Sequence, residues 1–337
     1  MKAVGYHQSL PISATDSLID VDLPAPAPGP HDLLVRVKAV SVNPVDTKIR
    51  KRFTPEPGET KVLGWDAAGI IEAVGDQVTL FEAGDEVWYA GAIDRPGSNA
   101  ELHLVDERIA AKKPQSLNFA EAAAMPLTTI TAWELLFDRL GIAKDNNAPS
   151  EQLLIIGAAG GVGSMMTQIA HRLTGATVIG TASRPQTRDW ALALGANHVI
   201  DHSQSLPEQL EQKGLASVSH VASLTHTDSH YQDIVKCLAP QGRMGLIDDP
   251  EQLDIGLMKQ KSISLHWEFM YTRSLFATTD MIKQHQLLSE AAGLVDTGIL
   301  RTTLSEHFGT INATNLKRAH AFIESGKACG KVVLEGF

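Results

Sequence analysis

The sequence has few cysteines: Cys237 and Cys329 are the two among 337 residues. They lie far apart and neither has a CxxC partner, which excludes a disulfide framework and a thiolate metal cage. The chain also lacks any stretch of about 18 uninterrupted apolar residues and any long apolar region near its N-terminus, so we expect neither a membrane segment nor export. These absences together predict a protein of the reducing cytoplasm.

Positive charge is scarce too. Lys and Arg number 29 against 39 Asp and Glu, which gives a net charge of -10. No basic run with interleaved aromatic residues is long enough to follow a phosphate backbone, so nucleic acid is excluded as a main partner. What is present is 43% hydrophobic and 20% charged residues. That composition is ordinary for a globular enzyme, and the length predicts two domains.

The first third of the chain is β-rich. Apolar and polar residues alternate between residues 33 and 42, which predicts a half-exposed antiparallel strand. Gly-Asp pairs at 75–76 and 84–85 separate the apolar runs that follow, as tight turns require. This pattern indicates a small closed or barrel-like β domain. A helical Ala- and Leu-rich pattern from Phe119 and a polar stretch over 143–152 then mark the passage into a second domain.

From residue 152 onward, short apolar runs alternate with helical patterns. Six candidate strands begin near residues 152, 177, 198, 219, 242 and 262. This alternation predicts a doubly wound parallel sheet of six strands. A helical pattern over 278–296 and a β-like segment over 330–337 follow, and we expect this tail to return to the first domain.

A glycine-rich loop follows the first of these strands directly and leads into a helix. It comprises Gly157, Gly160, Gly161, Val162 and Gly163. The GxxGxxG spacing allows a tight turn, a close backbone approach to a pyrophosphate and close packing of helix on strand. The helix N-terminus supplies N–H groups and a positive dipole end to the phosphates. A glycine-rich turn without a ligand is the alternative, but the strand–loop–helix context favours dinucleotide binding.

The residues at the end of the next strand indicate which dinucleotide binds. In NAD-specific folds an Asp or Glu about 20 residues past the glycines holds the adenosine ribose, whereas this chain has Ser183 and Arg184 there. Ser183 can donate to a 2′-phosphate and Arg184 can pair with it, so we predict NADPH over NADH. A solvated surface arginine is the alternative.

Three further residues are candidate cofactor contacts. Leu224 and Thr225 follow a predicted strand end, where ligands of open α/β sheets collect, so we expect their backbone near the nicotinamide ribose. Lys331, in the terminal β-like segment, is interpreted as a further contact. A solvated lysine is the alternative interpretation of Lys331.

Several motifs resemble the medium-chain dehydrogenase/reductase superfamily. They are SVNPVDTKIR at 41–50, GWDAAG at 64–69 with Gly75 and Val78, and the GAAGGVG loop at 157–163. The chain more closely resembles the zinc-free quinone oxidoreductase branch, and HWEFM at 266–270 resembles the zinc-type alcohol dehydrogenase-like subgroup. The match extends over nearly the whole chain.

This resemblance implies an α/β fold of two domains. A GroES-like, β-rich catalytic domain would comprise residues 1–128 and 273–337, and a Rossmann NADPH-binding domain residues 129–272. The resemblance also implies an active site in the cleft between the two domains. It implies a homodimer, commonly built by joining the Rossmann sheets edge to edge.

The departures from the zinc alcohol dehydrogenases concern the metal. In those relatives a Cys ligand stands at the position that matches Asn43, and a GHE motif supplies His and Glu where this chain has Trp65 and Asp66. An amide and an indole cannot replace a thiolate and an imidazole as zinc ligands. The four-Cys lobe of the structural zinc has no counterpart either. We therefore predict that no metal takes part.

Without a Lewis acid, the favoured acceptors are electron-poor quinones and α,β-unsaturated carbonyls. Their conjugation spreads the arriving charge onto oxygen, so hydrogen-bond donors can suffice to stabilise it. Asn43 is the candidate donor, with a turn cap before Pro44 as the alternative. Asp46 and Asp66 are candidates for proton relay, against turn capping or ion pairing.

Two tryptophans are candidate walls for a flat acceptor. Trp65 is favoured by its place in the motif, and Trp267 is a candidate for the substrate pocket, although a tryptophan commonly fills a core. The function predicted is thus NADPH-dependent quinone or enone reduction. A zinc-type alcohol dehydrogenase and a non-catalytic NADPH-sensing protein are the alternatives, and one- and two-electron reduction both stay open.

Overall fold

The computed structural model describes residues 1–144 and 151–337. They form two compact units, Met1–Ile130 with Tyr271–Phe337, and Thr131–Met270. The predicted domain boundaries, after residues 128 and 272, stay predictions. Of the polar stretch over 143–152, residues 145–150 lie outside the described part.

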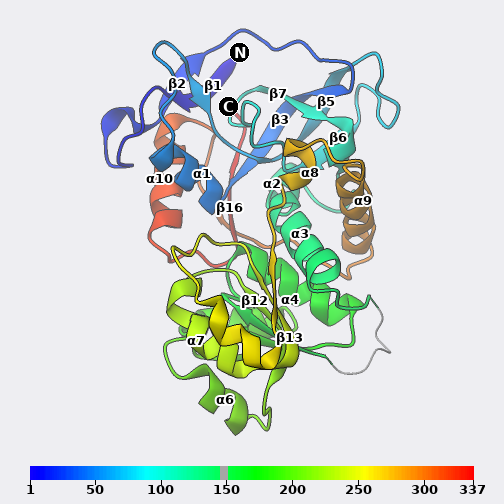
Figure 1. The fold of residues 1–337 in the computed structure, drawn as a ribbon. Helices are drawn as coiled ribbons and strands as arrows, with labels where there is room; N and C mark the ends of the chain where they lie inside the picture. The colour runs from blue at the N-terminus through cyan, green and yellow to red at the C-terminus, as the bar shows by residue number, and fades with distance from the viewer. Residues whose placement is uncertain (145–150) are drawn as a thin grey trace. The chain divides into compact units, whose positions relative to one another are not determined.

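The first unit contains two sheets (Figure 1). The smaller has the order β2-β1-β4, and the larger has the order β15-β16-β3-β5-β6-β8 with β7 also paired to β3. The strands are β1 Lys2–Tyr6, β2 Ile19–Asp22, β3 Asp32–Val42, β4 Lys61–Val62, β5 Asp66–Val74, β6 Glu86–Tyr89, β7 Leu102–Asp106, β8 Ala110–Lys112, β15 Leu304–His307 and β16 Lys331–Glu335. The helices are α1 Pro44–Arg52, α2 Phe119–Ala123, α8 Thr272–Leu275, α9 Lys283–Asp296 and α10 Ala313–Glu324, with short 3-10 turns at Thr15–Ser17 and Glu107–Ile109.

Strand β3 is the centre of the larger sheet. Its first half alternates as the sequence predicts, with Leu33 and Val35 buried and Arg36 exposed. From Ala39 to Val42 every side chain is buried. Strands β5 and β16 pair antiparallel with this half of β3 on its two sides. The last strand of the chain therefore lies beside the end of β3.

The helical stretch predicted from Phe119 is divided into pieces. Helix α2 ends before Pro126, and α3 spans Pro126–Trp133. Proline lacks an N–H and disfavours a helical conformation in the residue before it, which accounts for the break. A π-helical turn, Glu134–Arg139, follows, in which Leu140 N–H donates to Leu135 O at 2.9 Å. None of the described helices is long and apolar enough to cross a membrane.

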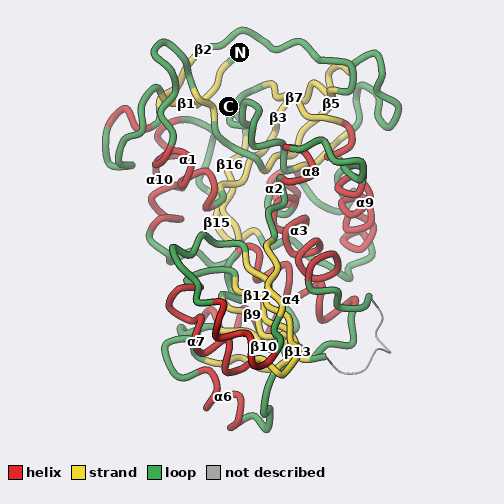
Figure 2. The backbone as a smooth tube through the Cα atoms, viewed as in Figure 1, coloured by secondary structure: helices red, strands yellow, loops and turns green. Residues whose placement is uncertain are grey.

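The second unit contains the six-stranded parallel sheet expected from the sequence (Figure 2). Its order is β11-β10-β9-β12-β13-β14, which is the doubly wound order 3-2-1-4-5-6. The strands are β9 Gln152–Ile156, β10 Thr177–Thr181, β11 His198–Ile200, β12 Val218–Ser223, β13 Leu238–Leu246 and β14 Ser264–Trp267. The helices are α4 Gly161–Leu173, α5 Pro185–Ala193, α6 Leu206–Gln212 and α7 Thr227–Cys237, with a 3-10 segment at Ile255–Lys261. The α/β fold class is thereby confirmed.

Candidate functional site

Three neighbouring strands of the first unit bring Asn43, Asp66 and Lys331 together. In the sheet, Val42 is paired with Val332 and Ser41 with Asp66. Asn43 follows the end of β3, while Asp66 and Lys331 begin the antiparallel strands on either side. All three side chains therefore emerge at the same end of the sheet.

The three side chains form a buried polar cluster. Lys331 Nζ and Asn43 Nδ2 each donate to Asp66 Oδ2 at 2.8 Å. Lys331 Nζ also donates to Asn43 Oδ1. The other oxygen, Asp66 Oδ1, accepts from the backbone N–H of Leu127 at 2.8 Å, in the first turn of α3. Both oxygens of Asp66 are thus satisfied, as a buried carboxylate requires.

The Asn43 amide retains one weakly engaged hydrogen. Besides its bond to Asp66, Nδ2 reaches Ser41 O at 3.4 Å, which is long for a hydrogen bond. Asn43 is 1% exposed. Its side chain is turned toward Asp66 and Lys331, while Asp46 Oδ2 accepts from the Asn43 backbone N–H at 2.7 Å at the start of α1. Oxyanion donation by Asn43 stays a prediction.

Asp46 is buried beside this cluster. Its burial raises the pKa to about 7, and the nearby Asp66 carboxylate acts in the same direction. The bond from Asn43 N–H and the positive charge of Lys331 oppose that increase. A carboxyl group with such a pKa exchanges its proton near neutral pH, which suits it to a proton relay.

Trp65 and Tyr271 lie next to each other in the same unit. Trp65 is fully buried, and its indole N–H donates to Ala92 O at 3.0 Å. The ring of Tyr271 meets it edge-on, with centroids 6.4 Å apart. Burial, together with the negative charges of Asp46 and Asp66, raises the pKa of Tyr271 well above its usual value. Tyr271 is not among the site residues predicted from the sequence, although it directly follows the HWEFM motif.

In the second unit, the glycine loop connects β9 to α4 at the carboxyl edge of the sheet. Gly157 has a φ of +86°, a conformation that favours glycine, and its N–H donates to Thr181 Oγ1 at 2.9 Å. A Cβ on Gly163 would lie 2.2 Å from Gly157 O, whereas one on Gly160 would meet nothing closer than 3.5 Å. The loop is therefore tight beneath α4 and open above Gly160, as pyrophosphate binding requires.

The other predicted cofactor residues of this unit lie at the same edge. Ser183 and Arg184 are exposed between β10 and α5. Leu224 N–H donates to Ile156 O at 3.3 Å, and the Thr225 methyl group would lie 2.9 Å from a Cβ on Gly157. The sheet thus gathers the glycine loop and the ends of β10 and β12. Lys331 belongs to the other unit and is 3% exposed, so it is not the solvated lysine considered above.

Trp267 ends the edge strand β14 and is 54% exposed. Its neighbour Glu268 is buried and pairs with Arg139 Nε at 2.8 Å. Trp65 and Trp267 belong to different units, so a substrate pocket lined by both stays a prediction.

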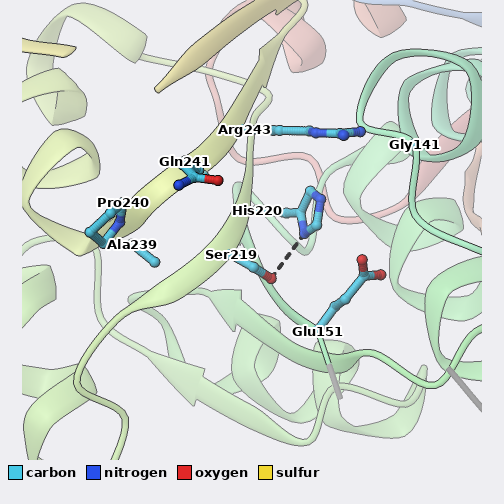
Figure 3. Close-up of a pocket in the computed structure, with 9 residues that line it drawn as sticks. Gly141, Glu151, Ser219, His220, Ala239, Pro240, Gln241 and Arg243 are labelled. Carbon is cyan, nitrogen blue, oxygen red and sulfur yellow. Dashed lines mark hydrogen bonds between the residues drawn. The ribbon is translucent and has the colours of Figure 1, made fainter. Parts of the chain in front are cut away.

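A hollow of about 240 Å³ lies at the opposite edge of the parallel sheet (Figure 3). Glu151 before β9, His220 near the amino end of β12 and Arg243 in the middle of β13 line it. Burial and the charge of Arg243 lower the pKa of His220 to about 4, so its ring is neutral at pH 7. Open α/β sheets bind nucleotides at the carboxyl ends of their strands, so this hollow is not the dinucleotide site.

The side chains at the expected metal position do not suit zinc as ligands. The Trp65 N–H is bonded to a carbonyl, Asn43 offers an amide, and Asp66 is occupied by three donors. Zinc sites require at least three thiolate, imidazole or carboxylate ligands. Across residues 1–144 and 151–337, no group of three or more His, Cys, Asp or Glu is arranged to hold a metal ion.

Comparison with known proteins agrees with this fold. The alcohol dehydrogenase GroES-like domain matches residues 29–115, and the zinc-binding dehydrogenase family matches residues 194–334. A zinc-type alcohol dehydrogenase-like protein of Staphylococcus epidermidis is 39% identical over 339 residues, which cover 99% of each chain.

Two solved structures extend the comparison. A protein of Rhizobium etli CFN 42, named for the zinc-dependent alcohol dehydrogenases, superposes with a TM-score of 0.97 and 57% identity over 100% of this chain and 98% of that one. The quinone oxidoreductase of Escherichia coli, solved with NADPH, superposes with a TM-score of 0.83 and 27% sequence identity. The match covers 99% of this chain and 100% of that one.

A Rossmann sheet with a glycine-rich loop after its first strand and a GroES-like unit together define an oxidoreductase of a family that binds nicotinamide cofactors. The chain belongs to the medium-chain dehydrogenase/reductase superfamily, among the zinc-type alcohol dehydrogenase-like proteins. The resemblance inferred from the motifs is confirmed.

Proposed function

We propose that the protein reduces quinones or α,β-unsaturated carbonyls with NADPH, by hydride transfer and without zinc. The observation that carries this proposal is the Asn43–Asp66–Lys331 cluster, in which a lysine ammonium holds the oxygens that a metal would need. A site of this kind cannot activate an alcohol through a Lewis acid. It suits acceptors whose conjugation already makes them electron-poor.

In the proposed reaction, residues of the chain itself would bind and polarise such an acceptor. In this proposal the weakly engaged Asn43 N–H donates to the acceptor oxygen, and the fixed charge of Lys331 favours negative charge developing nearby. Asp46, with its pKa of about 7, can supply a proton to the reduced product near neutral pH. NADPH, when bound, supplies the hydride.

The choice of NADPH rests on the edge of the Rossmann sheet. No carboxylate stands between β10 and α5, where Ser183 and Arg184 are exposed. Ser183 would donate to the 2′-phosphate and Arg184 would pair with it, while Gly157, Gly160 and the first turn of α4 would hold the pyrophosphate. The similarity to the E. coli quinone oxidoreductase, solved with NADPH, supports this choice.

We also propose a homodimer that works in the cytoplasm. Strand β14 is at the end of the described sheet, and the exposed Trp267 and Phe269 lie at and just beyond its carboxyl end. An edge strand with open backbone groups is a ready site for pairing with a second copy. Analytical ultracentrifugation of the wild type and of a Leu265→Pro variant tests this, since proline in β14 removes an N–H from the edge.

The deciding experiment is an NADPH-oxidation screen against quinones, enones and aldehydes, with and without a chelator, repeated with NADH. We expect the protein to turn over quinones or enones at a rate that a chelator does not lower. We also expect a preference for NADPH over NADH. Chelator-sensitive aldehyde turnover with bound zinc would instead identify an alcohol dehydrogenase. Tight NADPH binding without any turnover would identify a sensor.

A further inference from the structure

Lys331 is a buried cation in the first unit. It is 3% exposed, and its ammonium contacts Asp66 Oδ2 at 2.8 Å and Asn43 Oδ1. Asp66 is fully buried and Asn43 is 1% exposed. Burying an ammonium is costly unless it is paired and hydrogen-bonded, so these two acceptors are what make its position tolerable.

The ammonium binds the groups that stand at the metal-ligand positions of the zinc-dependent relatives. Asn43 matches the cysteine ligand, and Asp66 matches the glutamate of the GHE motif. In this chain one cation bridges both oxygens. A cation held between two oxygens is an arrangement that a metal ion also adopts, here with one positive charge in place of the two of zinc.

We propose that Lys331 is a built-in substitute for the metal cation: it neutralises Asp66 and fixes the orientation of the Asn43 amide. Lys331 is thus a positioning residue that acts through Asn43. By donating to Asn43 Oδ1, it fixes the amide so that Nδ2 donates to Asp66 Oδ2 at 2.8 Å and reaches Ser41 O only at 3.4 Å, which leaves the second N–H weakly engaged. It also polarises the amide, which strengthens Nδ2 as a donor. The catalytic part of this inference rests on the proposed function.

The proposal differs from a cofactor contact in its consequences. If Lys331 bound a cofactor phosphate, its replacement would weaken the affinity of the protein for the nucleotide. If Lys331 replaces a metal cation, its replacement would instead lower the stability of the protein, because the buried Asp66 carboxylate would have no counter-ion. The variant would also transfer hydride more slowly, while its affinity for the nucleotide stayed unchanged.

The first test is a double-mutant cycle of Lys331→Met and Asp66→Asn, followed by thermal unfolding of NADPH-free protein. Each single variant is expected to lose roughly 10 °C in Tm, and the double variant less than the sum of the two. Lys112 and Asp85 form the matched control, since they also lie 2.8 Å apart but Lys112 is 64% exposed. Lys112→Met and Asp85→Asn should show almost no coupling. Equal coupling in the two cycles would overturn the proposal.

The cycle remains informative if Lys331→Met does not fold. Recovery of folding in the double variant then supports the pairing. If Asp66→Asn folds while Lys331→Met and the double variant do not, the result contradicts the pairing.

The second test measures hydride transfer and nucleotide binding separately in Lys331→Met. We expect the single-turnover rate to fall about 100-fold with the Kd for NADPH within twofold of wild type, and Lys331→Arg to recover part of kcat. A weaker Kd with an unchanged rate would assign Lys331 to the cofactor instead. If the wild type reduces no acceptor, the proposed function fails, whereas the unfolding cycle still decides whether Lys331 is the fixed cation.

Discussion

Asp46 Oδ2 accepts a hydrogen bond from the backbone N–H of Asn43 at 2.7 Å, which joins the start of α1 to the residue before it. Because Asp46 is buried, its pKa rises from 3.8 to about 7. The folded protein therefore binds more protons than the unfolded chain between these values. Stability that is present below pH 3.8 is lost as the pH rises through 7.

Replacing Asp46 by Asn should remove this pH dependence. The amide oxygen can still accept from Asn43 N–H, so the variant should gain on the order of a few kcal/mol relative to wild type at pH 8.5 and little at pH 4.5. Urea unfolding at the two pH values measures the difference. Parallel behaviour of variant and wild type across this range would show that Asp46 titrates normally.

Gly163→Ala should weaken dinucleotide binding. Its Cβ would lie 2.2 Å from Gly157 O, so the loop must move away from α4, and we expect at least a tenfold higher Kd for NADPH. Gly293→Ala in α9 is the matched control, because a Cβ there meets nothing within 4 Å and alanine favours a helix. Titration of both variants by fluorescence checks this. A wild-type Kd for Gly163→Ala would mean that the loop does not hold the nucleotide.

Ser183→Asp should reverse the cofactor preference. A carboxylate between β10 and α5 would repel a 2′-phosphate and accept from a ribose hydroxyl. We expect the ratio of kcat/KM for NADPH to that for NADH to fall about 100-fold. Arg172→Ala, in the last turn of α4, controls for a general change of surface charge. An unchanged ratio would remove Ser183 and its neighbour Arg184 from the recognition of the phosphate.

His320 should make the fold sensitive to acid. It is fully buried, and neither ring nitrogen has a hydrogen-bond partner among the described residues. Burial, with Arg50 and Lys51 nearby, lowers its pKa from 6.5 to about 3. The unfolded chain therefore binds the extra proton between these values, so stability present above pH 6.5 is lost as the pH falls toward 3.

His320→Phe tests this directly. The variant should lose less stability than wild type between pH 6.5 and pH 4.5, by on the order of 1 to 3 kcal/mol. The exposed His7 carries the same substitution as a control and should leave the pH profile unchanged. Guanidinium unfolding at the two pH values supplies the measurement, and identical profiles for all three proteins would contradict a buried neutral imidazole.

The parallel sheet could be predicted because its strands are local signals. Each apolar run between Gln152 and Trp267 indicates a strand from a few neighbouring residues. The glycine loop indicates the order of strand, turn and helix. Pro126 is a local signal for the break between α2 and α3, but the Ala-rich residues on either side of it favour one continuous helix. The π-helical turn at Glu134–Arg139 has no comparable sequence signal.

The cluster around Lys331 could not be predicted, because it depends on pairing between distant strands. Nothing near residue 331 indicates that β16 lies beside β3, so the lysine was interpreted as a cofactor contact. The motif did single out Asn43 and Asp66, but the partners of their side chains follow from register alone.

The first unit is assembled from segments on either side of the second unit, and this affects how the chain folds during synthesis. Asp66 and Lys331 are 265 residues apart, so at translation rates of 5–20 residues per second the carboxylate is made roughly 13 to 53 s before its counter-ion. The Rossmann strands are all present by then, and their sheet can close first. Until β16 is made, Asp66 lacks its lysine partner and β3 lacks one neighbouring strand, so the first unit is completed after the second.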